Sequence, residues 1–130
     1  MAAIKAYTDL SQSKTLSKIL PIESADMCYL QENGQAKTIS PSKLNEILNV
    51  SKPQVIPCWS LAALLEEIPE VINFDDDESD YTLEILKEHE LYYLSYGNPL
   101  ENSKIEIEPQ ENFVDACVDM IDKLHELKML

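Results

Sequence analysis

The chain has 130 residues, 45% of them hydrophobic, and its 24 acidic residues against 10 lysines give a formal net charge of -14 at pH 7. This length predicts a single domain, 1–130, whose core can form without disulfides or a structural metal. Because arginine is absent and the lysines are scattered, the composition argues against direct binding to nucleic acid or to an anionic membrane.

The three cysteines indicate a reducing compartment. Cys28, Cys58 and Cys117 lie far apart and form no Cys-x-x-Cys pair, so at least one stays unpaired in any disulfide scheme. Residues 1–10 lack the apolar segment of a signal peptide, and no run of about 18 apolar residues predicts a membrane helix. We therefore expect a cytoplasmic protein with reduced thiols.

The first half of the chain predicts short helices and a hairpin. Apolar spacing favours a helix over residues 11–20, which Pro21 ends. A hairpin is expected at 27–39, because the Asn-Gly pair at 33–34 accepts the positive φ angles of a tight turn. The Ser-Pro pair at 40–41 then has the pattern of a helix start, an N-cap followed by proline.

A clearer helix is expected over residues 59–68, before Pro69, which cannot continue it. Its apolar residues follow the i, i+3, i+4, i+7 spacing of one buried face: Leu61, Leu64, Leu65 and Ile68. The acidic run 75–80 predicts an exposed loop, because it concentrates like charges without apolar neighbours.

The second half of the chain predicts the main sheet. Residues 82–87 and 91–96 are rich in aliphatic and aromatic side chains, and the short link between them is sufficient for an antiparallel hairpin. Alternating isoleucine and glutamate at 105–108 predicts a third strand with one polar face. We expect a hairpin or meander at about 82–108.

The last segment predicts a long C-terminal helix. Asn112 is expected to cap it, Asp115 to complete a capping box, and Asp119 to pair with Lys123 one turn later. One side of the helix is apolar: Phe113, Ala116, Cys117, Met120, Ile121, Leu124 and Leu127. Together with the strands, this pattern predicts an α+β fold in which amphipathic helices cover a small antiparallel sheet.

One enzymatic hypothesis uses Cys58 as a nucleophile. It precedes a predicted helix, whose N-terminal dipole would lower the thiol pKa, and it adjoins Trp59 as in papain-type enzymes. His89 or His125 would be the general base. Because the glycine and serine context of the papain signature is missing, a small cysteine-dependent hydrolase is an alternative and not the leading hypothesis.

The acidic run contains ligand-type residues but no complete calcium loop. Asp75, Asp77 and Ser79 match the first positions of an EF-hand, whereas Asp80 stands where glycine is needed and Leu86 where a glutamate is needed. The two histidines lack a second ligand at helical spacing, and two glycines cannot build a phosphate-binding loop. We expect no metal and no cofactor.

A recognition surface is the other functional hypothesis. Its candidate residues are Tyr92 and Tyr96 in the strand 91–96, because tyrosine supplies a rigid contact area with a polar tip, and the acidic residues Asp75, Asp76 and Asp77. The leading interpretation is a non-enzymatic acidic protein-interaction domain with an unidentified protein partner. An alternative is a nucleic-acid-mimicking decoy for a basic protein, since spaced carboxylates can imitate phosphates.

Two stretches of the chain, mainly in its second half, resemble small uncharacterised proteins of bacterial prophages and mobile elements. The first is Pro-Cys-Trp-Ser-Leu-Ala-Ala-Leu-Leu at 57–65, and the second combines Asp-Ala-Cys-Val at 115–118 with Lys-Leu-His-Glu-Leu at 123–127. The resemblance implies a bacterial cytoplasmic accessory protein. It brings no activity, cofactor or site residue with it.

Overall fold

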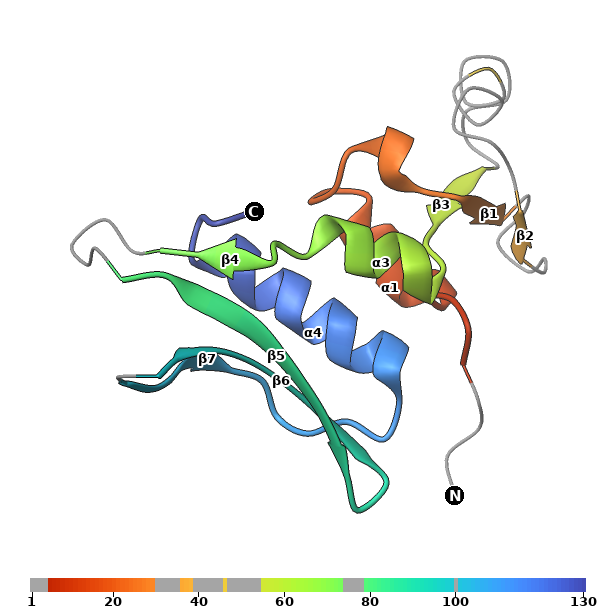
Figure 1. Ribbon diagram of the computed structural model, residues 1–130. Coiled ribbons are helices and arrows are strands. Elements are labelled where there is room, and N and C mark those ends of the chain that lie inside the picture. The colour runs from red at the N-terminus through yellow and green to blue at the C-terminus, as the bar shows by residue number, and fades with distance from the viewer. Residues whose placement is uncertain (1–4, 30–35, 39–45, 47–54, 74–78, 100) are drawn as a thin grey trace. The chain divides into compact units, whose positions relative to one another are not determined.

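The computed structural model describes residues 5–29, 36–38, 46, 55–73, 79–99 and 101–130 (Figure 1). The chain divides into two compact units, one spanning Lys5–Glu67 and the other containing Ile68–Leu130. Both combine helix with antiparallel sheet, so the predicted α+β class is confirmed. One sheet has three strands in the order β2-β1-β3, and the other has four in the order β4-β5-β6-β7. The single domain stays a prediction.

The predicted hairpin near residues 27–39 forms part of the three-stranded sheet. β1 (Met27–Tyr29) pairs antiparallel with β2 (Ala36–Thr38), while the Asn-Gly pair at 33–34 lies outside the described residues. The other side of β1 pairs with β3 (Ile56–Cys58), for which the sequence predicted no strand. Because β3 is an edge strand, it can accommodate Pro57, which has no backbone N–H to donate.

The first helix, α1 (Leu10–Leu16), has a capping box that the sequence analysis missed. The Asp9 carboxylate accepts a hydrogen bond from the backbone N–H of Gln12 at 2.8 Å, and the Gln12 side chain accepts one from the Asp9 N–H at 3.1 Å. Partial burial acts to raise the pKa of Asp9, but the Gln12 bond and the Lys5 ammonium, 3.0 Å away, hold it below its usual value.

The predicted extension of α1 to residue 20 is wrong. The Ser17 hydroxyl donates to the Lys14 carbonyl oxygen at 2.7 Å, and the next backbone amides, at Lys18 and Ile19, bond only three residues back. These bonds tighten the chain into turns before a short 3-10 helix, η1 (Ile22–Ser24), follows Pro21. The helix expected after Ser40 lies outside the described residues apart from Glu46, which is helical.

The predicted 59–68 helix corresponds to α3 (Leu61–Glu67), which Ser60 caps. The Ser60 hydroxyl accepts a hydrogen bond from the backbone N–H of Ala63 at 3.2 Å. Asp26 in turn accepts hydrogen bonds from both the backbone N–H and the hydroxyl of Ser60, the first at 2.9 Å. Leu64 is fully buried, and the helix ends just before Pro69, as predicted.

The predicted meander is confirmed in the four-stranded sheet. Its strands are β5 (Tyr81–Glu88), β6 (Leu91–Asn98) and β7 (Glu101–Glu106), and an unpredicted short strand, β4 (Val71–Ile72), is added at the β5 edge. Ile85 lies opposite Leu94, and Leu86 lies opposite Tyr93. Because directly opposite residues share a face, these two pairs lie on different faces of the sheet.

The C-terminal helix, α4 (Phe113–Glu126), lies against one face of this sheet (Figure 1). Leu94 and Tyr96 of β6 are buried on that face, and the ring of Tyr92 stacks on Phe113 with centroids 4.9 Å apart. Burying one aliphatic side chain stabilises a fold by about 1.5–3 kcal/mol, so the apolar stripe of α4 is a major contribution. Its buried members are Val114, Ala116, Cys117, Val118, Met120, Ile121 and Leu124.

The predicted capping box of α4 is wrong. Asn112 is the N-cap residue, but its side chain makes no capping hydrogen bond. The helix start is instead fixed by tertiary contacts, since the backbone of Gln110 exchanges hydrogen bonds of 2.7 and 3.1 Å with that of Tyr92. The Gln110 amide also donates to the Asp119 carboxylate, which therefore takes this partner in place of the predicted Lys123.

The turn between β5 and β6 is made by two residues in the left-handed region. His89 has φ 53° and Glu90 has φ 64°, the positive values that a type I′ hairpin turn requires at both of its central positions. Such turns usually contain asparagine and glycine, because a side chain with a Cβ is crowded at positive φ. The hairpin therefore forms despite its turn sequence.

Replacing Glu90 with glycine should stabilise the protein. An L-residue in the left-handed region costs roughly 1–2 kcal/mol, and the greater freedom of glycine in the unfolded chain offsets part of the gain. We expect Glu90→Gly to raise the free energy of unfolding by about 1 kcal/mol in urea titrations. The matched control is Glu84→Gly in the middle of β5, which should destabilise. A midpoint for Glu90→Gly at or below that of the unmodified chain would contradict this account.

Candidate binding surface

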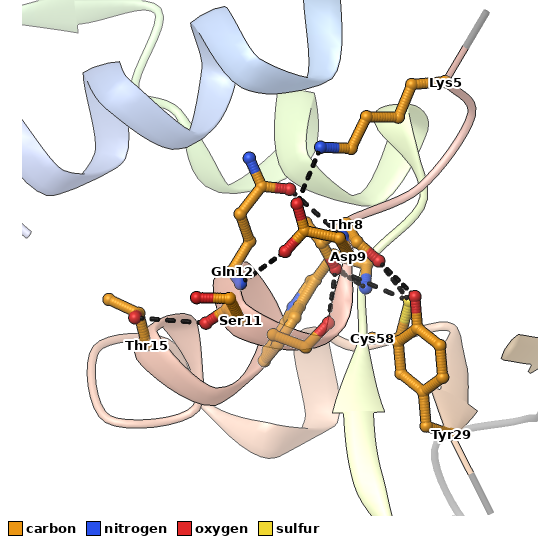
Figure 2. A network of polar contacts seen from close by, with 10 residues as sticks. Lys5, Thr8, Asp9, Ser11, Gln12, Thr15, Tyr29 and Cys58 are labelled. Carbon is orange, nitrogen blue, oxygen red and sulfur yellow. Dashed lines mark hydrogen bonds and ion pairs between the residues drawn. The ribbon is translucent and has the colours of Figure 1, made fainter. Parts of the chain in front are cut away.

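Cys58, the candidate nucleophile, is fully buried at the end of β3 (Figure 2). Its Sγ lies 3.4 Å from the carbonyl oxygen of Thr8 and 3.5 Å from the Thr8 hydroxyl. Burial raises the pKa of the Cys58 thiol, the opposite of what a thiolate nucleophile needs. The predicted lowering of its pKa is therefore not found.

The residues around Cys58 form a structural network that joins the N-terminal segment to β3 (Figure 2). The Thr8 hydroxyl lies 2.7 Å from the Ser13 hydroxyl and accepts a hydrogen bond from the backbone N–H of Trp59 at 3.2 Å. The Tyr29 hydroxyl donates to the Thr8 carbonyl oxygen at 2.9 Å, and burial raises the pKa of Tyr29 to about 12. These bonds satisfy polar groups that are closed to solvent.

Neither candidate histidine is held as a general base. The side chain of His89 is 83% exposed at the hairpin turn, with its Nε2 3.4 Å from the Glu88 carboxylate. Nδ1 of the exposed His125 lies 3.0 Å from the carbonyl oxygen of Leu130. In the described part of the chain, no group of three or more histidine, cysteine, aspartate or glutamate side chains could hold a metal ion.

The proposed tyrosine surface needs correction. Tyr96 is fully buried and donates its hydroxyl hydrogen bond to the carbonyl oxygen of Pro69 at 2.6 Å, so it offers no surface to a partner. Tyr92 is half-buried against Phe113, with the Lys87 ammonium 5.2 Å from its ring centroid. Both tyrosines face α4. The acidic candidates Asp75, Asp76 and Asp77 lie outside the described residues.

The opposite face of the sheet carries an exposed leucine beside a half-buried tyrosine. Leu86 is 53% exposed and lies directly opposite Tyr93, which is half-buried. Two residues along β5 in either direction are the exposed Glu84 and Glu88. We call this surface the outer face and define it by six residues: Glu84, Leu86, Glu88, Leu91, Tyr93 and Glu106.

Register places the remaining members of the outer face. Leu91 lies opposite Glu88, while Ser95 lies opposite Glu84 on one side and Glu106 on the other, so Glu106 shares the face from β7. Three carboxylates thus surround two leucines and a tyrosine. Sequence reasoning missed Leu86, Leu91 and Glu106, although the alternation of Glu84, Leu86 and Glu88 predicts that they share one side of a strand.

An open pocket of about 560 Å³ lies elsewhere in the same unit, between β4 and the end of the chain. The residues that line it are Pro69, Val71, Ile72, Asn73, Leu127, Lys128 and Met129. None of the candidate residues from the sequence lies in this lining. The pocket therefore gives no support to a catalytic role for Cys58, His89 or His125.

Comparison of the chain with protein-family models, with curated proteins and with solved structures gives no match in any of the three. Within the described ranges, none of the helices combines the length and the apolar character needed to cross a bilayer.

The buried thiols should react slowly in the folded protein. Cys28, Cys58 and Cys117 are all buried, and burial raises the pKa of Cys117 to about 12. We expect iodoacetamide to modify Cys58 at least about a hundredfold more slowly in the folded chain than in urea, because reaction requires the fold to open. Mass spectrometry of peptides from timed reactions measures each site. Rapid labelling of Cys58 in the folded protein would contradict the buried network and favour the hydrolase.

Proposed function

We propose that this chain is a non-enzymatic protein-interaction domain that binds its partner through an acidic surface. The observation that carries the proposal is the exposed Leu86 beside the half-buried Tyr93, among carboxylates. An apolar centre with a charged rim is the usual anatomy of a protein interface. Within this proposal the protein acts in the bacterial cytoplasm, as an accessory protein of a mobile element, in keeping with its free cysteines.

The two alternatives receive less support from the same residues. A cysteine-dependent hydrolase needs an accessible, acidic thiol, whereas Cys58 is buried and its pKa is raised. A nucleic-acid-mimicking decoy needs carboxylates in a continuous array, whereas Leu86 interrupts Glu84 and Glu88 on the outer face.

The test is reconstitution of a complex from purified proteins. The tagged chain, cross-linked in bacterial cells and purified, is expected to carry one protein in reproducible amounts. That protein, produced separately, should form a complex with the chain in size-exclusion chromatography with light scattering. Raising the salt concentration should weaken the complex, because a charged rim is screened. Two purified proteins that elute apart at low salt would contradict the proposal, and displacement by duplex DNA would favour the decoy.

A further inference from the structure

The four-stranded sheet has helix on one face only within its own unit. α4 lies over the face that carries Leu94 and Tyr96, and no described helix of residues 68–130 lies over the outer face (Figure 1). Sheets bury their apolar face against another layer of structure, and helices are the usual layer. The exposed Leu86 therefore lies where a second helix would complete the arrangement.

Carboxylates flank the apolar residues of the outer face. Glu84, Glu88 and Glu106 are all exposed, and they are the charged members of the six residues that define this surface. Lys87 is the only lysine of the β5–β6 hairpin, and its ammonium lies over the ring of Tyr92, on the face that α4 covers. The hairpin thus separates its charges between the two faces.

This distribution disfavours a second copy of the chain as the occupant. Two outer faces packed together would bring Glu84, Glu88 and Glu106 against their own equivalents, and each chain has a formal net charge of -14. Like charges brought together in an interface repel one another and weaken association. A partner that covers Leu86 must instead supply positive charge on both sides of an apolar group.

We propose that the outer face binds a basic amphipathic helix of the partner, an inference that rests on the interaction function proposed above. Alternate residues on a strand are about 7 Å apart, so Glu84 and Glu88 lie at about that distance on either side of Leu86. Residues four apart on a helix are about 6 Å apart. A helix with a leucine four residues from a lysine or arginine on each side therefore matches the row Glu84, Leu86 and Glu88 along β5. The apolar side of this helix would then lie on Tyr93.

The probe is a short fluorescent peptide of lysine and leucine with leucines at helical spacing. A second peptide has the same composition with lysine and leucine alternating, which favours a strand. Fluorescence anisotropy measures the affinity of each for the full chain. We expect the helical peptide to bind more tightly than the alternating one, and its affinity to fall as salt is added.

Variants of Leu86 and Tyr93 locate the contact. Leu86→Ser and Tyr93→Ser should each weaken binding of the helical peptide about tenfold, which corresponds to about 1.4 kcal/mol. The apolar control is Leu127→Ser, which removes a 42% exposed leucine away from the outer face and should leave the affinity unchanged. Thermal unfolding of each variant confirms that it is folded.

Two double variants distinguish the effect of carboxylates on the outer face from the effect of the protein's net charge on peptide binding. Glu84→Gln with Glu88→Gln should weaken binding about tenfold, whereas Asp122→Asn with Glu126→Gln, exposed on α4, removes the same charge and should have little effect. Equal losses in the two double variants, unchanged affinity in Leu86→Ser, or tighter binding of the alternating peptide would each overturn the inference. So would an unmodified chain that binds neither peptide. The complex of purified proteins tests the interaction function separately from all of these.

Discussion

The packing of α4 on β6 is the interaction on which the unit containing residues 68–130 depends. A helix of 14 residues buries seven side chains, and Leu94 and Tyr96 are closed to solvent on the sheet face that it covers. Two tyrosines of β6 are held on this covered face and are therefore not free to contact a partner. Tyr92 stacks on Phe113 of α4, and the Tyr96 hydroxyl donates a hydrogen bond to the Pro69 carbonyl oxygen. Once one face of a two-faced strand is buried, the side-chain alternation assigns every other residue to the opposite face.

That assignment links the fold to the proposed function. The hairpin places Lys87 on the covered side and leaves carboxylates around Leu86 and Tyr93 on the outer face. Within the proposed function the acidic residues have a local role, since three carboxylates surround an apolar contact. In the other unit, burial and hydrogen bonding at Cys58 serve stability, because its thiol helps to join the N-terminal segment to β3.

Elements defined by local periodicity could be predicted from the sequence, and elements defined by distant contacts could not. α4, the 82–96 hairpin and the end of α3 follow from apolar spacing and proline. β3 and β4 have only two or three residues, and each becomes a strand only by pairing with another segment, β3 with β1 and β4 with the start of β5. Alternation separates Tyr93 from Tyr96 in the sequence, but only the position of α4 shows which of them is buried. Cys58 is enclosed by Thr8, which lies 50 residues earlier in the chain.

The most direct test of the account is NMR mapping of where a basic amphipathic helix contacts the chain. Amide and methyl signals of the isotopically labelled protein would be followed as the unlabelled helical lysine-leucine peptide is added. The account predicts that the largest shifts cluster at Leu86, Tyr93 and their neighbours on β5 and β6, with small shifts along the exposed side of α4. Shifts centred on Asp122 and Glu126, or spread evenly over the acidic surface, would contradict it.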